Sequence, residues 1–233
     1  MKEWAKSLGL AFILFLIIRI FLVQAFTIPT GSMERTLLVG DYLLVNKMVY
    51  GAKTPRKLPL LALELPILRL PGLETPRRGE IVVFEYPKDR DMDFVKRCVA
   101  VGSDTVEMRD KVLYINSIPQ SEPYIQQVDP TIRRDENRFY SIDSFAWQKE
   151  YLVPEALFRL DGEYRPTRDN FGPLVVPEGK YFCLGDNRDY SNDSRFWGFV
   201  DERLIKGRPL ILYYSWNKEH KFPRFGRIGQ IIQ

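Results

Sequence analysis

Residues 81–116 read IVVFEYPKDRDMDFVKRCVAVGSDTVEMRDKVLYIN. Four short runs rich in β-branched and aromatic residues make up most of this stretch, and glycine, proline or aspartate bounds each run, as in strands joined by tight turns. The runs cover 81–86, 94–101, 106–108 and 112–116, and residues 109–111 predict a hairpin connection between the last two. This segment therefore predicts antiparallel β-structure.

Similar runs recur along the rest of the chain, at 43–50, 181–184 and 210–214, and residues 201–206 predict a short helix. Strands of this length and spacing are typical of an all-β core folded as coiled sheets or a partial barrel. The expected fold is mainly β, with an antiparallel core built from residues 27–120 and 172–233. Residues 121–171 are polar and weakly periodic, and they predict a small inserted subdomain or long loop.

The N-terminal residues form the longest apolar stretch, from 8 to 26, which Arg19 and Gln24 interrupt near its end. As a helix, these 19 or so residues would extend roughly 28 Å, close to the thickness of a bilayer core. Lys2 and Lys6 precede the stretch, which favours a cytoplasmic N-terminus. We expect residues 1–26 to form a cytoplasmic end and one transmembrane helix. The alternative is a cleavable signal peptide with a cleavage site near Ala25, and the intact mass would distinguish the two.

The bulk composition excludes several classes of function. The chain has 233 residues, with 34 Lys and Arg against 30 Asp and Glu, a net charge of +4 that is mixed along the sequence. No nucleic-acid-binding motif accompanies it. A basic C-terminal cluster (Lys206, Arg208, Lys218, Lys221, Arg224 and Arg227) would suit either anionic lipid or an exposed tail. One histidine, His220, and two cysteines are too few for a structural zinc site, and we expect any nucleophile to act without imidazole.

Two segments supply candidates for such a nucleophile and its base. In 29–33, PTGSM, the proline and glycine favour a sharp turn that presents the hydroxyl of Ser32 and a backbone N–H together. In 94–100, FVKRCVA, strand alternation places Lys96 on one apolar face with Phe94, Cys98 and Ala100. Burial there would lower the lysine pKa and make the amine a base. The alternative is a lysine at a sheet edge with its amine in water.

A third segment, 185–198, reads GDNRDYSNDSRFWG and is dense in charged and hydroxyl side chains. It fails as an EF-hand, because Ser194 stands where that loop needs glycine and Val200 where it needs glutamate. We predict no metal site. A loop cross-linked by Asp–Arg pairs is the better interpretation, and such a loop could hold an active-site lysine in place.

Taken together and in this order, the turn at 29–33, the pair Lys96–Arg97 and the loop 185–198 resemble bacterial type I signal peptidases (leader peptidases). The resemblance implies a membrane-bound serine endopeptidase that needs no cofactor and removes signal peptides after small residues, in the Ala-x-Ala pattern. It implies Ser32 as the nucleophile and Lys96 as the general base. The Ser32 amide and the Thr30 hydroxyl would form the oxyanion hole.

The same resemblance implies supporting residues and partners. Ser191 would orient the lysine amine, and Asp186, Asp193 and Arg195 would support it, with Asp193 and Arg195 as an ion pair. The implied substrate pocket consists of Ile28, Met33, Leu37 and Val95. The implied partners are exported preproteins and membrane lipid, without nucleic acid or metal, and we expect a monomer. The implied location is the bacterial cytoplasmic (inner) membrane, crossed once, with the catalytic domain on the extracytoplasmic face.

Some features depart from the family pattern or stay open. Residues 100–104, AVGSD, replace the usual Gly-x-Pro-Gly-Asp turn.

Cys98 and Cys183 would form either a disulfide or, as we favour, two buried thiols. Residues 58–73 are apolar but interrupted by proline, and they would lie on the membrane or cover the core. Two rival functions remain: a penicillin-recognising acyl-enzyme, from the S-x-x-K pattern of Ser215 and Lys218, and an anchored β-domain that binds exported chains without cutting them.

Overall fold

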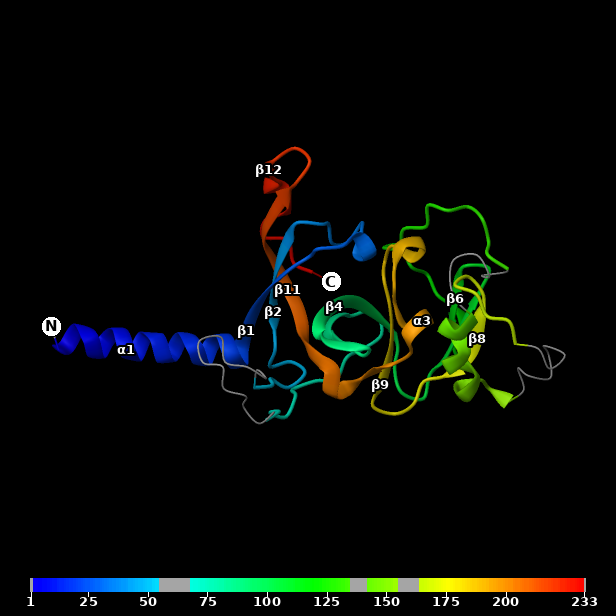
Figure 1. Cartoon of the computed structure of the whole chain (residues 1–233), viewed down its shortest axis with the longest axis horizontal. Coiled ribbons are helices and arrows are strands. Elements are labelled where there is room, and N and C mark those ends of the chain that lie inside the picture. The colour runs from blue at the N-terminus through cyan, green and yellow to red at the C-terminus, as the bar shows by residue number, and fades with distance from the viewer. Residues whose placement is uncertain (1, 55–67, 135–141, 155–163, 233) are drawn as a thin grey trace. The chain divides into compact units, whose positions relative to one another are not determined.

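The computed structural model describes residues 2–54, 68–134, 142–154 and 164–232 (Figure 1). The chain forms two compact units. The first unit consists of Met1–Ile28, Gly40–Thr75 and Lys206–Gln233, and the second of Pro29–Val39 and Pro76–Ile205. The predicted division at 121–171 stays a prediction. The apolar segment 58–73 lies mostly outside the described residues.

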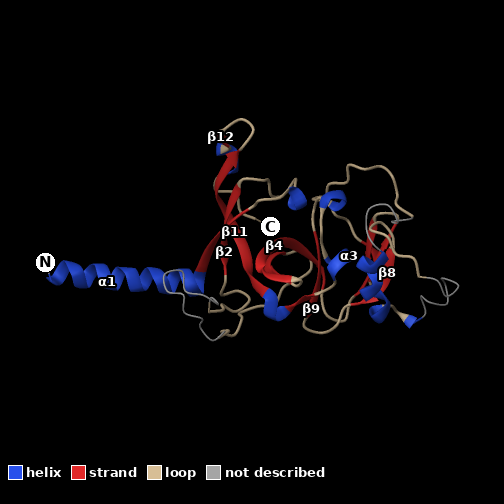
Figure 2. Cartoon of the chain, in the orientation of Figure 1, coloured by secondary structure: helices blue, strands red, loops and turns tan. Residues whose placement is uncertain are grey.

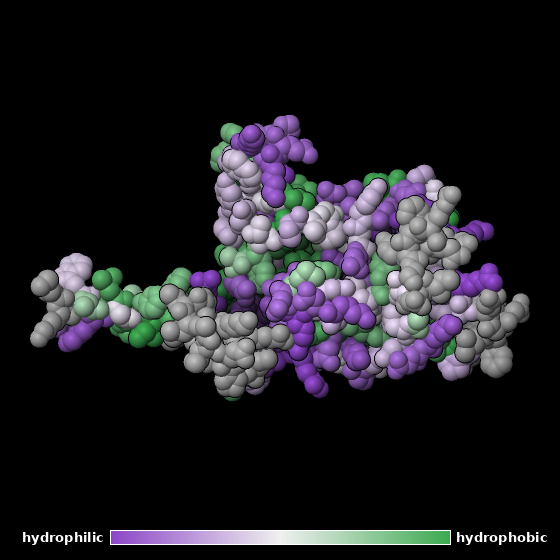
Figure 3. All heavy atoms as spheres, viewed as in Figure 1, coloured by the Kyte–Doolittle hydropathy of each residue, from purple (hydrophilic) through white to green (hydrophobic). Residues whose placement is uncertain are grey.

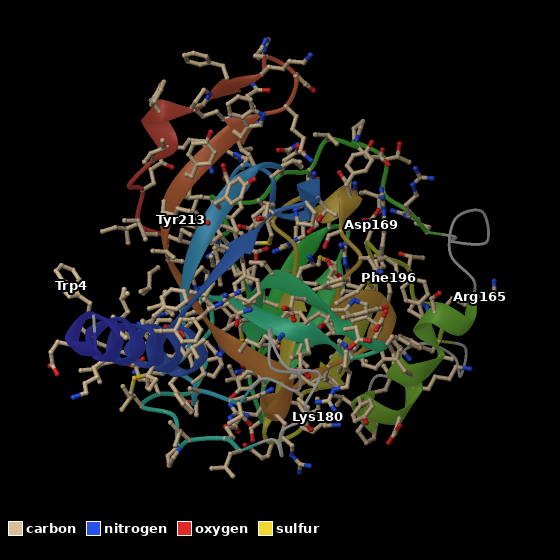
Figure 4. All side chains as sticks on the ribbon, turned by 60° about the vertical axis from the view of Figure 1, so that its left-hand side comes forward. Trp4, Arg165, Asp169, Lys180, Phe196 and Tyr213 are labelled. Carbon is tan, nitrogen blue, oxygen red and sulfur yellow. The ribbon has the colours of Figure 1, made fainter. Side chains whose placement is uncertain are left out.

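The first unit begins with helix α1 (Lys2–Ile17), which continues through a π-helical turn, η1 (Ile18–Leu22), into strand β1 (Val23–Thr27). Apolar side chains of α1 are exposed, among them Leu8 and Leu10, and Trp4 projects from the helix near its free end (Figures 3 and 4). None of the helices in the described part of the chain is both long and apolar enough to cross a membrane.

The helix predicted over residues 8–26 is wrong at its C-terminal end, because the helical residues end at Leu22. Residues Val23 to Phe26 are strand instead, because they pair with strand β2 (Asp41–Asn46), from Val23 opposite Asn46 to Phe26 opposite Leu43. From Gln24 to Thr27, part-buried and exposed side chains alternate, which is the two-residue period of a strand. The predicted helix rested on a run of apolar residues, and such a run does not reveal this period.

The remaining strands of the first unit complete an antiparallel sheet. Strand β11 (Ile205–Asn217), whose first residue still belongs to the second unit, pairs with β2 and, at its far end, with β12 (Phe222–Pro223). A short 3-10 turn, η6 (Phe225–Arg227), follows. The order within this unit is β1-β2-β11-β12.

The second unit contains two antiparallel sheets (Figure 2). In the first, β3 (Ile81–Tyr86), β4 (Asp89–Ala100), β9 (Lys180–Leu184) and β10 (Val200–Asp201) pair in that order. In the second, β7 (Ile118–Pro119), β6 (Val112–Ile115), β5 (Thr105–Arg109) and β8 (Phe171–Val175) are neighbours in that order. The shared core includes Val106, Leu174, Phe182 and Leu184.

The mainly antiparallel β fold is confirmed. Residues 109–111 do connect β5 and β6, and Asp110 and Lys111 have positive φ angles of 44° and 70°, as a tight hairpin requires. The helix predicted at 201–206 is a single 3-10 turn, η5 (Glu202–Leu204), because β11 already begins at Ile205.

Within 121–171 the described residues include a longer 3-10 helix, η3 (Ile142–Tyr151). Phe171 starts strand β8, and Leu152 pairs with Leu174 and belongs to the buried core. The described ends of this segment are thus part of the second unit's packing.

Candidate active site

Ser32 and Lys96 meet in the second unit. Ser32 lies in the 3-10 turn η2 (Gly31–Met33), and Lys96 lies in the second half of β4. The Lys96 Nζ atom is 2.7 Å from Ser32 Oγ and 3.0 Å from the Val95 carbonyl oxygen, both within hydrogen-bond distance. Residues 64 positions apart in sequence thus form a direct amine–hydroxyl pair.

The surroundings of Lys96 lower its affinity for a proton. The residue is 4% exposed, and Nζ is 5.1 Å from the centre of the Phe94 ring, which shares its strand face. Burial lowers the pKa of Lys96 from 10.5 to about 8, and the negative charges of Asp193 and Asp186 oppose this change in part. The alternative of a sheet-edge lysine with its amine in water is wrong, since β4 has a neighbouring strand on each side.

The loop after β9 holds the turn that carries Ser32. The backbone N–H of Asn187 donates to the Ser32 carbonyl oxygen at 3.1 Å, and the Asp186 N–H points at the Met33 sulfur at 3.4 Å. Gly185 allows this close approach: a Cβ atom there would overlap the Ser32 carbonyl oxygen and lie 2.5 Å from Ser191 Cβ. Glycine is needed because backbone meets backbone at this point.

Asp186 links the strand of Lys96 to the turn of Ser32. Arg97 donates to both carboxylate oxygens of Asp186 at 2.9 and 2.8 Å, and Thr36 Oγ1 donates to the same carboxylate at 2.5 Å. The Arg97 guanidinium also stacks 3.8 Å from the centre of the Tyr124 ring. Asp186 is predicted as a supporting residue from the sequence, whereas the roles of its partners Arg97 and Thr36 become visible only in the structure.

Asp193 and Arg195 form a fully buried ion pair. Two guanidinium nitrogens of Arg195 lie 2.8 and 2.9 Å from the two carboxylate oxygens of Asp193. Asp193 also caps the short helix α3 (Ser194–Trp197) and accepts a hydrogen bond from the Gly185 N–H at 3.1 Å. Burial alone would raise the pKa of Asp193, but the charge and hydrogen bonds of Arg195 hold it below its usual value.

The remaining site residues are placed as follows. Ser191 follows the 3-10 turn η4 (Arg188–Tyr190), and its buried hydroxyl has no hydrogen-bond partner among the described residues. Its part in orienting Lys96 stays a prediction. Thr30 is exposed at the start of η2, without a side-chain bond to that turn.

The predicted pocket residues are divided between the two units. Met33 and Leu37 are buried and Val95 is half-buried, all in the second unit. Ile28 belongs to the first unit, where its backbone N–H donates to the Asp41 carbonyl. The pocket as a whole stays a prediction.

Ser215 and Lys218 are unsuited to acyl-enzyme chemistry. Ser215 is fully buried, and its hydroxyl donates to the Asp41 carboxylate at 2.6 Å, while Lys218 is exposed. Cys98 and Cys183 lie opposite each other on β4 and β9, and both are buried free thiols. Burial raises the pKa of the Cys183 thiol well above its usual value, so this neighbour of Lys96 carries no charge at neutral pH.

Comparison with known families accounts for this arrangement. The family described as signal peptidase, peptidase S26, matches residues 1–214. The chain belongs to this family. The resemblance seen in the three sequence segments is thereby confirmed, and the chain is a serine endopeptidase rather than a domain that only binds exported chains.

Two sequence relatives agree with this assignment. The chain is similar to "Signal peptidase I" of Aquifex aeolicus, with 36% identity over 250 residues that cover 92% of this chain and 85% of the relative. It is 34% identical to "Signal peptidase I" of Pseudomonas aeruginosa, over 98% of this chain and 78% of the relative. A solved signal peptidase I from Enterococcus faecalis is 29% identical, with a TM-score of 0.37, and covers 59% of this chain and 98% of its own length.

Proposed function

We propose that this enzyme removes N-terminal signal peptides from exported preproteins with Ser32 as the nucleophile and Lys96 as the general base. The observation that carries the proposal is the 2.7 Å contact between Lys96 Nζ and Ser32 Oγ in a buried, apolar setting. A serine hydroxyl needs a base to remove its proton, and a buried lysine with a lowered pKa is such a base.

The proposed chemistry follows from these two groups. Neutral Lys96 accepts the proton of Ser32 as Oγ attacks the carbonyl carbon of the scissile peptide, and a tetrahedral oxyanion forms. The Ser32 N–H and the Thr30 hydroxyl donate hydrogen bonds to this oxyanion. Protonated Lys96 then gives its proton to the leaving amine of the mature protein. A water molecule, deprotonated by Lys96, attacks the acyl carbon, and the lysine returns this proton to Ser32 Oγ as the acyl bond breaks and the signal peptide leaves.

The supporting residues fix the geometry that this chemistry needs. Asp186 and Asp193 hold the loop and strand around Lys96, Arg195 neutralises Asp193, and Ser191 orients the amine. Met33, Leu37 and Val95, all in the second unit, would form a shallow apolar pocket that accepts alanine before the cut. This pocket would select the second alanine of an Ala-x-Ala site.

The proposed substrate is still attached to the membrane, and so is the enzyme. The exposed apolar side chains of α1 support insertion of the N-terminal helix into a lipid bilayer (Figure 3). In this proposal the enzyme is a monomer of the bacterial cytoplasmic membrane, which α1 and η1 cross together, with Lys2 and Lys6 on the cytoplasmic side and the active site on the other.

A cleavage assay with a detergent-solubilised preprotein tests the proposal. Ser32→Ala and Lys96→Ala should each abolish cleavage while the circular dichroism spectrum stays that of the wild type. Lys88→Ala, at an exposed lysine between β3 and β4, is the matched control and should cleave normally. Wild-type turnover by Lys96→Ala would refute the dyad. Leucine in place of alanine immediately before the cut should prevent cleavage if the pocket is as proposed.

A further inference from the structure

Asn187 contacts the main chain on both sides of the Ser32 residue. Its side-chain Nδ2 donates to the Gly31 carbonyl oxygen at 3.0 Å, and its backbone N–H donates to the Ser32 carbonyl oxygen at 3.1 Å. Asn187 is 2% exposed, and its bond to Gly31 is part-buried. One buried residue thus holds the two peptide groups that flank the Ser32 Cα atom.

The bond from Asn187 Nδ2 to the Gly31 carbonyl affects the direction of the Ser32 N–H. The Gly31 carbonyl and the Ser32 N–H belong to the same planar trans peptide and point in opposite directions. A donor that fixes the direction of this carbonyl therefore also fixes the direction of the N–H. The hydrogen bond polarises the peptide as well, and a polarised peptide is a stronger donor from its N–H.

The orientation of the Asn187 amide follows from its neighbours. Nδ2 lies 3.1 Å from Glu34 Oε2 in addition to the Gly31 carbonyl. A carboxylate and a carbonyl are both acceptors, so the NH₂ end of the amide must face them. The Glu34 N–H also donates to the Gly31 carbonyl at 3.1 Å, so Glu34 and Asn187 together surround this oxygen.

The loop that carries Asn187 is itself held at both neighbouring residues. The Gln126 N–H donates to the Asp186 carbonyl at 2.7 Å, and the Arg188 N–H donates to the Gln126 carbonyl at 2.9 Å. The Asp186 side chain is bound by Arg97. These contacts leave the Asn187 side chain in a fixed position relative to Gly31.

We propose that Asn187 is a positioning residue that aims the Ser32 N–H at the oxyanion of the tetrahedral intermediate. The inference rests on the proposed function, in which that N–H is an oxyanion donor. Asn187 touches neither the substrate nor the reacting atoms and acts through the Gly31–Ser32 peptide. Loss of a whole oxyanion donor costs about 10² to 10³ in kcat, and a misdirected donor should cost roughly 10-fold to 100-fold.

Four variants separate this role from a purely structural one: Asn187→Ala, Asn187→Asp, Glu34→Gln and the double variant Asn187→Asp/Glu34→Gln. Asn187→Ala and Asn187→Asp should lower kcat with KM within about twofold of the wild type. Glu34→Gln keeps an oxygen acceptor for Nδ2 and should stay within about twofold of the wild type. In the double variant the introduced amide can donate to the introduced carboxylate, but the Gly31 carbonyl still lacks its side-chain donor, so kcat should stay low.

A pair of inhibitors provides the decisive measurement. A peptide aldehyde ending in alanine forms a tetrahedral adduct with Ser32, and the same peptide with a primary alcohol end forms no adduct and offers no anionic oxygen to the Ser32 N–H. Asn187→Ala should weaken inhibition by the aldehyde at least tenfold and leave inhibition by the alcohol unchanged. The ratio of the two inhibition constants does not depend on the fraction of enzyme that is folded, so a poorly folding variant still gives an answer.

Several results would overturn the inference. Asn187→Ala with wild-type kcat, equal loss of affinity for both inhibitors, or full recovery in the double variant would each exclude the proposed role. A shifted midpoint of the pH–rate profile would instead place the effect on Lys96. If Ser32→Ala still cleaves preprotein, the proposed function itself fails; if Ser32→Ala is inactive and Asn187→Ala is normal, only this inference fails.

Discussion

Arg97 donates two hydrogen bonds to the Asp186 carboxylate, at 2.9 and 2.8 Å, and both side chains are buried. The pair joins the residue after Lys96 to the residue before Asn187. The same carboxylate also accepts a hydrogen bond from Thr36, in the segment that follows Ser32. The ion pair therefore holds together the strand and the loop from which the active site is built.

Breaking this ion pair from one side should destabilise the protein. Asp186→Asn or Arg97→Met leaves a buried charge without its partner, which typically costs about 3–5 kcal/mol. Denaturant unfolding of the solubilised protein measures the loss. Arg109→Gln removes an exposed pair with Glu107 and should cost less than about 1 kcal/mol. Equal losses in the buried and exposed variants would contradict the prediction.

The rate of cleavage should depend on the protonation of Lys96. Its pKa in the folded protein is about 8, lowered mainly by burial, and only the neutral amine accepts the serine proton. kcat/KM should therefore rise tenfold per pH unit on the acid side and level off above a midpoint near 8. A pH–rate profile on a preprotein checks this.

Lys47 provides a matched control for that profile. Burial and the charge of Lys206 lower its pKa to about 8 as well, but it belongs to the first unit and not to the dyad. Lys47→Met should leave the midpoint of the acid limb unchanged. If the midpoint disappears in this variant, the titration belongs to Lys47 and not to Lys96.

Asp193→Asn should move the acid limb to lower pH. The Asp193 carboxylate raises the pKa of Lys96, because a nearby negative charge favours the protonated amine. Removing that charge lowers the lysine pKa further, so more of the base is neutral at a given acidic pH. Asp201→Asn, at the similar cap of η5, should not shift the profile. A shift to higher pH after Asp193→Asn would contradict the assigned sign.

Gly185→Ala should impair both stability and catalysis. Its Cβ atom would overlap the Ser32 carbonyl oxygen, and overpacking typically costs about 1–3 kcal/mol. Displacement of the serine by about 1 Å would lower kcat by roughly 10²-fold. Gly226→Ala is the control, since nothing lies within 4 Å of the added atom. Normal kcat in Gly185→Ala would show that the turn of Ser32 does not depend on this close approach.

Local patterns in the sequence predicted much of the fold and the central pair of residues. Strand alternation has a period of two residues, so the seven residues 94–100 were enough to predict that Lys96 lies on an apolar face of its strand. The absence of a usable histidine then left lysine as the available base for Ser32. The same patterns misplaced the end of the N-terminal helix, because pairing of β1 with β2 decides where the strand begins.

Contacts between distant segments were not visible in this way. Nothing in the sequence around Asn187 distinguishes its amide from other polar groups of the same loop. Its place beside Gly31 depends on where two segments 156 residues apart come together. The partners of Asp186 depend equally on the packing of β4 against the loop after β9.

The sequence by itself determined the mainly antiparallel β fold and the candidates Ser32 and Lys96 through residue types and short-range periodicity, and it indicated the family through the resemblance of three segments. Only the tertiary structure decided that the lysine amine lies 2.7 Å from the serine hydroxyl and that Asn187 holds the peptide of the Ser32 N–H. Distances between atoms far apart in sequence, and the burial that shifts a pKa, exist only after the chain has folded.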